Sequence, residues 1–320
     1  MVSRKVIFVL SAVVIAATLI SLFIHSRLQT GTDNGLNDTF PDSQVLPSPK
    51  AVLKVGENML SAYWARDSTT DLPDYVSNIQ YSVSNYGNAN AVNVSLVVYV
   101  DGSLHSSNTI PILLISQTET FLFSTITPYD SSSNVLIQAS CQASSDSYSF
   151  TVGSDLPRYW SEDPDVVKLF VTPKEADLVE MKNAIIENKF FLLPNWIALR
   201  DWVGNNVEYK HDSEAYGQED YWQLSKETLG FSTGDCEDYA ILLCSLLRAD
   251  GWSANDAFVV LGKNSQNQYH AWAKVNLGIL GWYNLEPQQD GWSTLIGDFL
   301  SLSGYSAMYE FNDLQFKQIG

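Results

Sequence analysis

The pattern of apolar and polar positions first marks out the N-terminus. Val6 to Ile24 carries no charged residue and is long enough to cross a membrane as a helix, which takes about 20 residues. Arg4 and Lys5 precede this run and only Arg27 follows it closely. The positive-inside rule therefore predicts a cytoplasmic N-terminus and an extracytoplasmic remainder.

We expect residues 1–28 to form a single-pass, uncleaved signal anchor that holds the protein at the cell surface. A cleaved signal peptide is the alternative, but the apolar run exceeds the usual length for such peptides and no clean small-residue cleavage motif follows it. Residues 29–50 are rich in Thr, Asn, Asp, Gly, Ser and Pro, with little to bury. This composition predicts a flexible tether.

Residues 51–155 show short alternating runs separated by turn signals such as Asn85 to Asn88 and Asp101-Gly102. Such spacing predicts an antiparallel β-sandwich of about seven strands. No titratable cluster occurs in this stretch, so we expect it to act as a spacer or binding module. The candidate strands are residues 79–84, 92–100, 109–115, 118–124, 135–143 and 148–152.

The pattern then becomes helical. Residues 156–164 contain two prolines and several charges, which is typical of an interdomain linker. Thr172 to Glu175 forms a capping box with a proline at the first helical position, and it predicts a helix to about Asn188. A second helix is expected from about residue 194 to 204. The polar stretch 210–220 is long enough for a loop that borders a cleft.

A candidate nucleophile follows this loop. Cys236 lies where Gly234-Asp235 meets an apolar helical run, and a thiol at a helix N-terminus faces unpaired N–H groups and the positive end of the helix dipole. Both features favour the thiolate. The backbone N–H of Cys236 and the indole N–H of Trp222 are candidate donors to a developing oxyanion.

A base and an orienting acid are found further along the chain. Residues 269–275 alternate as a strand does, and residues 281–287 are rich in aromatic residues and stop at a proline. If the two strands pair, the Glu286 carboxylate lies beside the His270 imidazole. We therefore expect Cys236 as nucleophile, His270 as general base and then acid, and Glu286 as the group that fixes the His270 tautomer.

The residues around the thiol oppose this chemistry. Asp235, Glu237 and Asp238 surround Cys236, and like charge disfavours a thiolate. We expect these carboxylates to point to solvent as caps and dipole partners, while an ion pair with His270 outweighs them. They could instead bind a divalent cation. The sequence shows no second ligand cluster, so neither a metal nor another cofactor is expected.

The three cysteines cannot all pair with one another, so at least one thiol must stay free in an oxidising compartment. Cys236 and Cys244 would lie about 12 Å apart along one helix at ~1.5 Å per residue. A disulfide needs Cα atoms within about 7 Å, so this pair is excluded. Cys244 lies in an apolar run and Cys141 in an alternating strand, which predicts that both are core residues.

Net charge limits the partners. Asp and Glu number 36 against 18 Lys and Arg, for a net charge of −18. This excess argues against nucleic acid and against binding of the soluble part to anionic lipid. The expected partners are a protein or peptide substrate and, through the N-terminal helix, the membrane. The oligomeric state stays open.

The order cysteine, histidine, acid resembles the transglutaminase-like cysteine-enzyme superfamily, in particular the extracytoplasmic members of archaea and bacteria. The resemblance covers about residues 165–320, and it implies a papain-like thiol fold with Cys236, His270 and Glu286 at the triad positions. The family acid is commonly aspartate, whereas this chain has glutamate. The motifs that carry the resemblance are GDCEDYAILLCSLLRADGW, HAW, WYNLEP and the DYWQLSKETL segment that precedes them. The first part of the chain is similar to immunoglobulin-like adhesion modules of microbial surface proteins.

These observations predict an α+β chain: an N-terminal transmembrane helix, an all-β immunoglobulin-like sandwich at residues 51–155, and a papain-like or transglutaminase-like domain at residues 156–320. The expected activity is acyl transfer from an amide through a thioester. Transfer to water gives a peptidase or amidase, and we expect this outcome because microbial relatives resemble peptidases at least as often as crosslinkers. Transfer to an amine gives a crosslinking enzyme. A noncatalytic adhesion or scaffold module is the alternative.

Overall fold

The computed structural model describes residues 48–288 and 304–320. Within these ranges no helix is long and apolar enough to cross a membrane. The expected anchor at residues 1–28 and nearly all of the expected tether at residues 29–50 lie outside the described residues, so both stay predictions.

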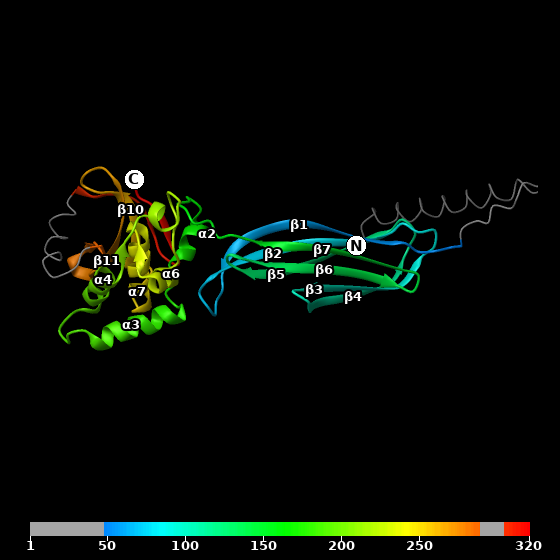
Figure 1. The fold of residues 1–320 in the computed structure, drawn as a ribbon, viewed down its shortest axis with the longest axis horizontal. Coiled ribbons are helices and arrows are strands. Elements are labelled where there is room, and N and C mark those ends of the chain that lie inside the picture. The colour runs from blue at the N-terminus through cyan, green and yellow to red at the C-terminus, as the bar shows by residue number, and fades with distance from the viewer. Residues whose placement is uncertain (1–47, 289–303) are drawn as a thin grey trace, which may run out of the picture. The chain divides into compact units, whose positions relative to one another are not determined.

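The first part of the described chain is a sandwich of two antiparallel sheets (Figure 1). One sheet has the strand order β1-β2-β5 and the other has the order β4-β3-β6-β7. Alternate residues point inward, so that Ile79, Tyr81 and Val83 of β2 are buried in one core. The strands are β1 (Leu53–Arg66), β2 (Pro73–Asn85), β3 (Ala91–Val100), β4 (Ser103–Leu113), β5 (Thr118–Pro128), β6 (Ser131–Cys141) and β7 (Ser144–Ser154).

The prediction of a sandwich with about seven strands is confirmed, and each candidate strand overlaps an observed one. The turn at Asp101-Gly102 is also confirmed, since both residues have positive φ as a tight hairpin requires. Strand β1 was not among the candidates. It pairs in its sheet with β2 alone, and a bulge between Met59 and Ser61 interrupts its alternation. An edge strand of this kind lacks a regular hydrophobic pattern.

The second part combines helices with a five-stranded antiparallel sheet of order β12-β11-β10-β13-β14. Figure 1 shows α7 in yellow, with α3, α4 and α6 around it, and α7 packs against β10 and β11. Every residue from Glu237 to Leu247 of α7 is buried, as expected of a helix at the centre of a domain. The helices are α2 (Pro164–Val167), α3 (Ala176–Asn188), α4 (Asn195–Asn206), α5 (Asp212–Ala215), α6 (Ser225–Phe231) and α7 (Cys236–Ala249). The strands are β8 (Glu208–Tyr209), β9 (Thr233–Gly234), β10 (Ala257–Lys263), β11 (Tyr269–Asn276), β12 (Trp282–Leu285), β13 (Ser306–Phe311) and β14 (Phe316–Gln318), with 3-10 turns η1 (Lys168–Phe170) and η2 (Gly278–Leu280).

The predicted start of one helix is wrong in detail. Helix α3 begins at Ala176 rather than beside Thr172, because Glu175 is the cap and its carboxylate accepts a hydrogen bond from the Leu178 N–H at 2.9 Å. Thr172 is instead buried, and its N–H donates to Ser245 Oγ. In the segment 156–164, which we expect to be the interdomain linker, Leu156 and Arg158 are buried.

Candidate active site

The expected nucleophile, Cys236, is the first residue of α7. The chain enters the helix through β9, which pairs in parallel with β8. Gly234 is required at this entry, because a Cβ there would lie 2.8 Å from Oδ2 of Asp238. The tight approach of the backbone to α7 thus fixes where the helix begins and where the thiol lies.

Asp238 joins this entry segment to the helix. Its Oδ1 accepts a hydrogen bond from the Gln223 N–H at 2.8 Å, and its Oδ2 accepts one from the Asp235 N–H at 3.2 Å. The side chain is fully buried. Its role in the structure is therefore to hold the segments before α7 in place.

His270 and Glu286 lie together. His270 is in β11, and Glu286 directly follows β12, which pairs with the second half of β11. The distance from His270 Nε2 to Glu286 Oε2 is 2.8 Å, and the two side chains are only 14% and 4% exposed. The expected pairing of imidazole and carboxylate is therefore present. Because Nε2 faces Glu286, Nδ1 is the ring nitrogen left for a thiol.

Further contacts hold the acid in position. Tyr305 Oη lies 3.5 Å from Glu286 Oε2, and the Gln288 N–H donates to Oε1 at 3.3 Å. The Tyr305 ring meets the His270 ring edge-on, with 5.7 Å between centroids. Arg200 of α4, which is fully buried, donates from Nε to the Glu286 carbonyl. No local motif predicts that Tyr305 contacts Glu286. Arg200 could have been found, because a charged residue on the apolar face of a predicted helix indicates a buried polar contact.

Cys236 and His270 line the same cavity, which has a volume of about 470 Å³. Glu237 lines it as well, together with a group of aromatic and aliphatic side chains that includes Trp160 and Tyr309. The structure thus brings the sulfur and the imidazole to one accessible groove, with the carboxylate of Glu286 hydrogen-bonded behind the imidazole.

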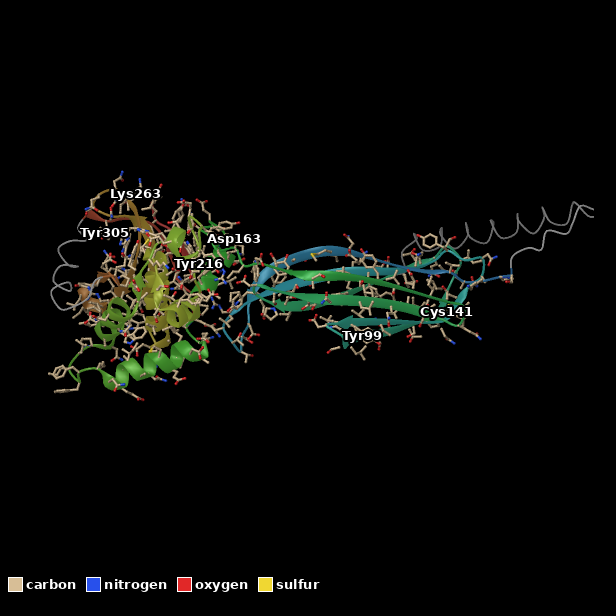
Figure 2. The ribbon with its side chains drawn as sticks, in the orientation of Figure 1. Tyr99, Cys141, Asp163, Tyr216, Lys263 and Tyr305 are labelled. Atoms are coloured by element: carbon tan, nitrogen blue, oxygen red, sulfur yellow. The ribbon has the colours of Figure 1, made fainter. Side chains whose placement is uncertain are left out.

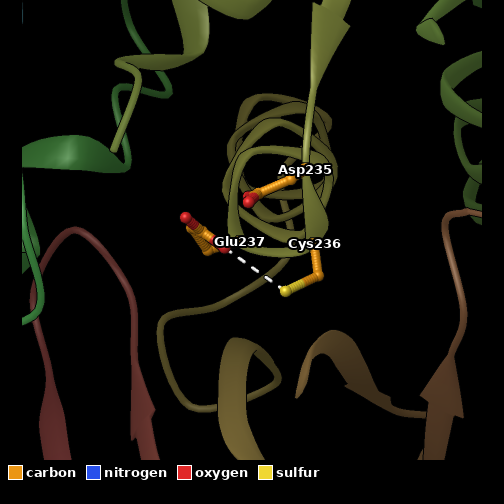
Figure 3. Close-up of side chains that lie close together, drawn as sticks. All are labelled: Asp235, Cys236 and Glu237. Carbon is orange, nitrogen blue, oxygen red and sulfur yellow. Dashed lines mark hydrogen bonds between the residues drawn. The ribbon is translucent and has the colours of Figure 1, made fainter. Parts of the chain in front are cut away.

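The expectation that the acidic neighbours of Cys236 point to solvent is wrong for two of them. Glu237 and Asp238 are buried, because α7 is packed on all sides. Figure 3 shows that the Glu237 side chain turns toward the thiol, with Oε2 3.3 Å from Cys236 Sγ.

This geometry disfavours the thiolate. Cys236 is only partly exposed, and burial raises the pKa of its thiol well above the ordinary value. The charges of Glu237 and Asp235 raise this pKa further, whereas a hydrogen bond from the Ala271 N–H opposes the rise. Burial and the nearby Asp235 also raise the pKa of the Glu237 carboxyl well above its usual range. These neighbours therefore act against the activated thiolate that the sequence led us to expect.

Two more carboxylates meet these residues: Asp212 at the start of α5 and Asp220 in the loop before α6. Ligand atoms of Asp212, Asp220 and Glu237 lie within 4.8 Å of one another, as do those of Asp212, Asp235 and Asp238. Asp212 is buried, burial raises its pKa to about 6, and its Oδ1 has no hydrogen-bond partner among the described residues. We call these five residues the acidic cluster.

A metal was not expected because the sequence showed no second group of ligands. The structure supplies one, since Asp212 and Asp220 of the stretch 210–220 lie close to the carboxylates of α7. Carboxylate oxygens suit a hard divalent cation such as Ca²⁺.

Two other expectations can be compared with the structure. Trp222 is buried and lines the same cavity as Cys236, so its proposed role as an oxyanion donor stays a prediction. Cys244 is a buried core thiol and Cys141 packs partly buried against the sandwich core, as expected. All three cysteines are free thiols.

Comparisons with known proteins agree with both parts of the fold. The model of the transglutaminase-like superfamily matches residues 192–287, the segment that contains Cys236, His270 and Glu286. The CARDB family model matches residues 67–146, within the sandwich. A search of curated proteins found no match.

Several solved structures are similar to parts of the chain. LapG of Legionella pneumophila (EGTA-treated) is 18% identical, with 46% of this chain and 69% of that chain covered and a TM-score of 0.31. A candidate cysteine protease of Cytophaga hutchinsonii is 12% identical, with 79% and 82% covered and a TM-score of 0.31. A CARDB domain of Pyrococcus furiosus, solved with di-metal ions, is 11% identical, with 33% and 97% covered and a TM-score of 0.25. The family matches show that this chain carries a domain of the transglutaminase-like superfamily, preceded by a CARDB module.

Proposed function

We propose that the protein is an extracytoplasmic, membrane-anchored thiol enzyme that cleaves amide bonds of proteins or peptides. The observation that carries the proposal is the cavity shared by Cys236 and His270, with Glu286 hydrogen-bonded to the imidazole. A nucleophile, a base and an orienting acid in this arrangement are what covalent acyl transfer requires.

In the proposed reaction Cys236 Sγ bonds to the amide carbonyl carbon while its proton passes to His270 Nδ1. Glu286 stabilises the imidazolium through Nε2–H. The C–N bond then breaks as His270 returns the proton to the leaving nitrogen, which leaves a thioester on Cys236. Water then attacks the thioester carbonyl carbon as His270 accepts one of its protons, the C–S bond breaks, and the proton returns to Cys236 Sγ as the carboxylic acid is released. The backbone N–H of Cys236, at the start of α7, is the proposed oxyanion donor.

The acidic cluster is the second element of the proposal. Carboxylates near Cys236 oppose its ionisation, so a divalent cation bound among them would offset their charge and favour the thiolate. Two observations support this part: the five carboxylates form two close groups, and the buried Asp212 Oδ1 is unpartnered among the described residues.

The remaining parts of the chain are assigned by the same proposal. Residues 1–28 would anchor the protein with its N-terminus in the cytoplasm, residues 29–50 would tether it, residues 51–155 would act as a spacer or binding module, and residues 156–320 would carry the activity. The uncharged run from Val6 to Ile24 supports the anchor.

Two competing functions remain to be separated by experiment. Transfer of the acyl group to an amine would make the protein a crosslinking enzyme. A noncatalytic scaffold is the other candidate, and the contact of the Cys236 thiol with the Glu237 carboxyl favours it, because this contact opposes ionisation of the thiol.

The test is incubation of the full chain with a peptide library and a primary-amine probe, read by mass spectrometry. Cleaved peptides that disappear with Cys236→Ala support the proposal, and probe-labelled peptides would favour the crosslinking enzyme. Cys141→Ala is the matched control, because this thiol lies in the sandwich. Peptides unchanged with and without Ca²⁺ would contradict an enzymatic role and support the scaffold.

A further inference from the structure

The cavity beside Cys236 is lined by aromatic and aliphatic side chains, which the proposed chemistry does not use. The Trp160 ring lies 4.8 Å from the Tyr309 ring and 5.8 Å from the Trp222 ring, centroid to centroid. Leu261 and Met308 line the same cavity. The Tyr309 hydroxyl donates a hydrogen bond to Glu162 Oε1 at 2.7 Å, and this bond fixes the position of the ring.

A β-bulge builds part of this wall. Leu261 of β10 pairs with Tyr309 of β13, but the next residue, Gly262, pairs with Ala307, so Met308 is the extra residue. Successive residues of a regular strand point to opposite faces, yet both Met308 and Tyr309 line the cavity. A bulge that redirects a side chain beside a reactive group is a built feature.

Gly262 keeps the bulged strands in contact. A Cβ at this position would lie 2.1 Å from the Ser306 carbonyl oxygen and 2.9 Å from Trp272, so a larger residue would force β10 and β13 apart. The same end of β10 carries Lys263, with Tyr305 nearby (Figure 2). Lys263 Nζ lies 5.2 Å from the ring centre of Tyr269, which is largely exposed and also lines the cavity.

We propose that this cavity binds one large aromatic or aliphatic side chain of the substrate, next to the amide bond that meets Cys236. The inference rests on the proposed function and names the substrate class: peptides with a bulky apolar residue beside the scissile bond. The volume of about 470 Å³ lies within the range of ligand pockets, about 300–1,000 Å³. Met308 suits such a site, because its flexible thioether adapts to differently shaped apolar groups.

Charge complements shape in this assignment. An acidic substrate side chain would meet Glu237, which lines the cavity and belongs to the acidic cluster. An apolar side chain faces no such repulsion, and its burial favours binding by about ten- to a hundredfold over an exposed one. We therefore expect the cavity to select substrates with a bulky apolar side chain over substrates with an acidic one.

The experiment measures the rate at which Cys236 is alkylated, so that it does not depend on turnover. The full chain is treated with N-chloroacetyl derivatives of phenylalaninamide, alaninamide and aspartic acid α-amide, with chloroacetamide as the small reference. Modification of Cys236 is followed by mass spectrometry. Relative to chloroacetamide, we expect the phenylalanine reagent to react about tenfold or more faster than the aspartate reagent, with alanine between them.

Variants locate the preference in the cavity. Tyr269→Ala removes an exposed wall residue with little effect on folding, and it should reduce the advantage of the phenylalanine reagent severalfold. Met308→Lys should reduce it further and raise the rate of the aspartate reagent. Tyr86→Ala, the same substitution at an exposed site in the sandwich, should change nothing.

The outcomes separate the two proposals. Equal rates for the three reagents, with Cys236 still labelled, would overturn the assignment of the cavity and leave the nucleophile intact. Ordered rates without any peptide cleavage would support the cavity and count against the enzymatic function. If no reagent, including chloroacetamide, labels Cys236, both proposals are contradicted.

Discussion

Glu286 Oε2 lies 2.8 Å from Nε2 of His270, and Tyr305 and the Gln288 N–H contact the same carboxylate. The carboxylate is therefore held in one orientation and sets the orientation of the imidazole. This residue is a glutamate, whereas an aspartate is common at the matching position of the transglutaminase-like proteins that the sequence resembles, and it follows directly after the residues of β12 that pair with β11.

Substitution of Glu286 should affect the rate of the chemical step. Glu286→Gln keeps the size of the side chain but removes the charge that stabilises the imidazolium, so we expect kcat for peptide cleavage to fall by about 10²- to 10⁴-fold. Glu286→Asp keeps the charge and should retain more activity. Steady-state kinetics with one cleaved peptide measures kcat for both variants. Equal kcat values for Glu286→Gln and Glu286→Asp would contradict a role of the Glu286 charge in the reaction.

The reactivity of Cys236 should depend on Glu237. Because burial and neighbouring carboxylates raise the pKa of the thiol, the rate of iodoacetamide labelling of the metal-free protein should rise only at pH values above the ordinary thiol range. Glu237→Gln removes one of these carboxylates and should move the pH-rate profile to lower pH. Cys244, whose pKa burial also raises, serves as the internal control. A profile that Glu237→Gln leaves in place would contradict the assigned cause.

Asp212 should make the protein less stable as pH rises. Burial raises its pKa from 3.8 to about 6, so between these values the folded state binds more protons than the unfolded state. The free energy of unfolding contributed by this group is therefore greatest at low pH and decreases as pH rises toward about 6. Thermal unfolding of the metal-free wild type and Asp212→Asn between pH 4 and 7 should show a smaller decrease for the variant. Parallel curves would exclude Asp212 as the cause.

Calcium should reverse this destabilisation if the acidic cluster binds it. At about 100 times Kd, a ligand that binds only the folded state adds roughly 2.7 kcal/mol to the free energy of unfolding. We expect CaCl₂ to raise the Tm of the wild type and to speed labelling of Cys236 at neutral pH, and EGTA to reverse both changes. Asp212→Asn should weaken both responses, whereas Asp146→Asn in the sandwich should retain them. The same response in wild type and Asp212→Asn would place any bound calcium elsewhere.

Much of the fold could be predicted from local patterns. The alternation in the sandwich predicted paired strands, and the Gly234 to Asp238 motif predicted the start of α7. The position of His270 beside Glu286 followed from two strand patterns close in sequence, because adjacent antiparallel strands bring such residues together. These features depend on few long-range contacts.

The electrostatics of the site depend on long-range packing, which is why the sequence reading of them was wrong. Glu237 appears as a helix-capping acid in the sequence, but the surrounding elements bury it against the thiol. Asp212 joins it from the start of α5, which is distant in the sequence. Met308 enters the cavity wall through a bulge in β13 whose register depends on β10. None of these three contacts has a local sequence signal.

The most direct test of the central claim is detection of the thioester on Cys236. The full chain, with CaCl₂, is mixed with a peptide that carries phenylalanine beside the scissile bond, quenched in acid within seconds, digested and analysed by mass spectrometry. The account predicts that the acyl part of the peptide is attached to the fragment containing Cys236, that hydroxylamine removes it, and that it is absent with Cys236→Ala. Peptide cleavage without this adduct, or with the same yield in Cys236→Ala, would contradict the account.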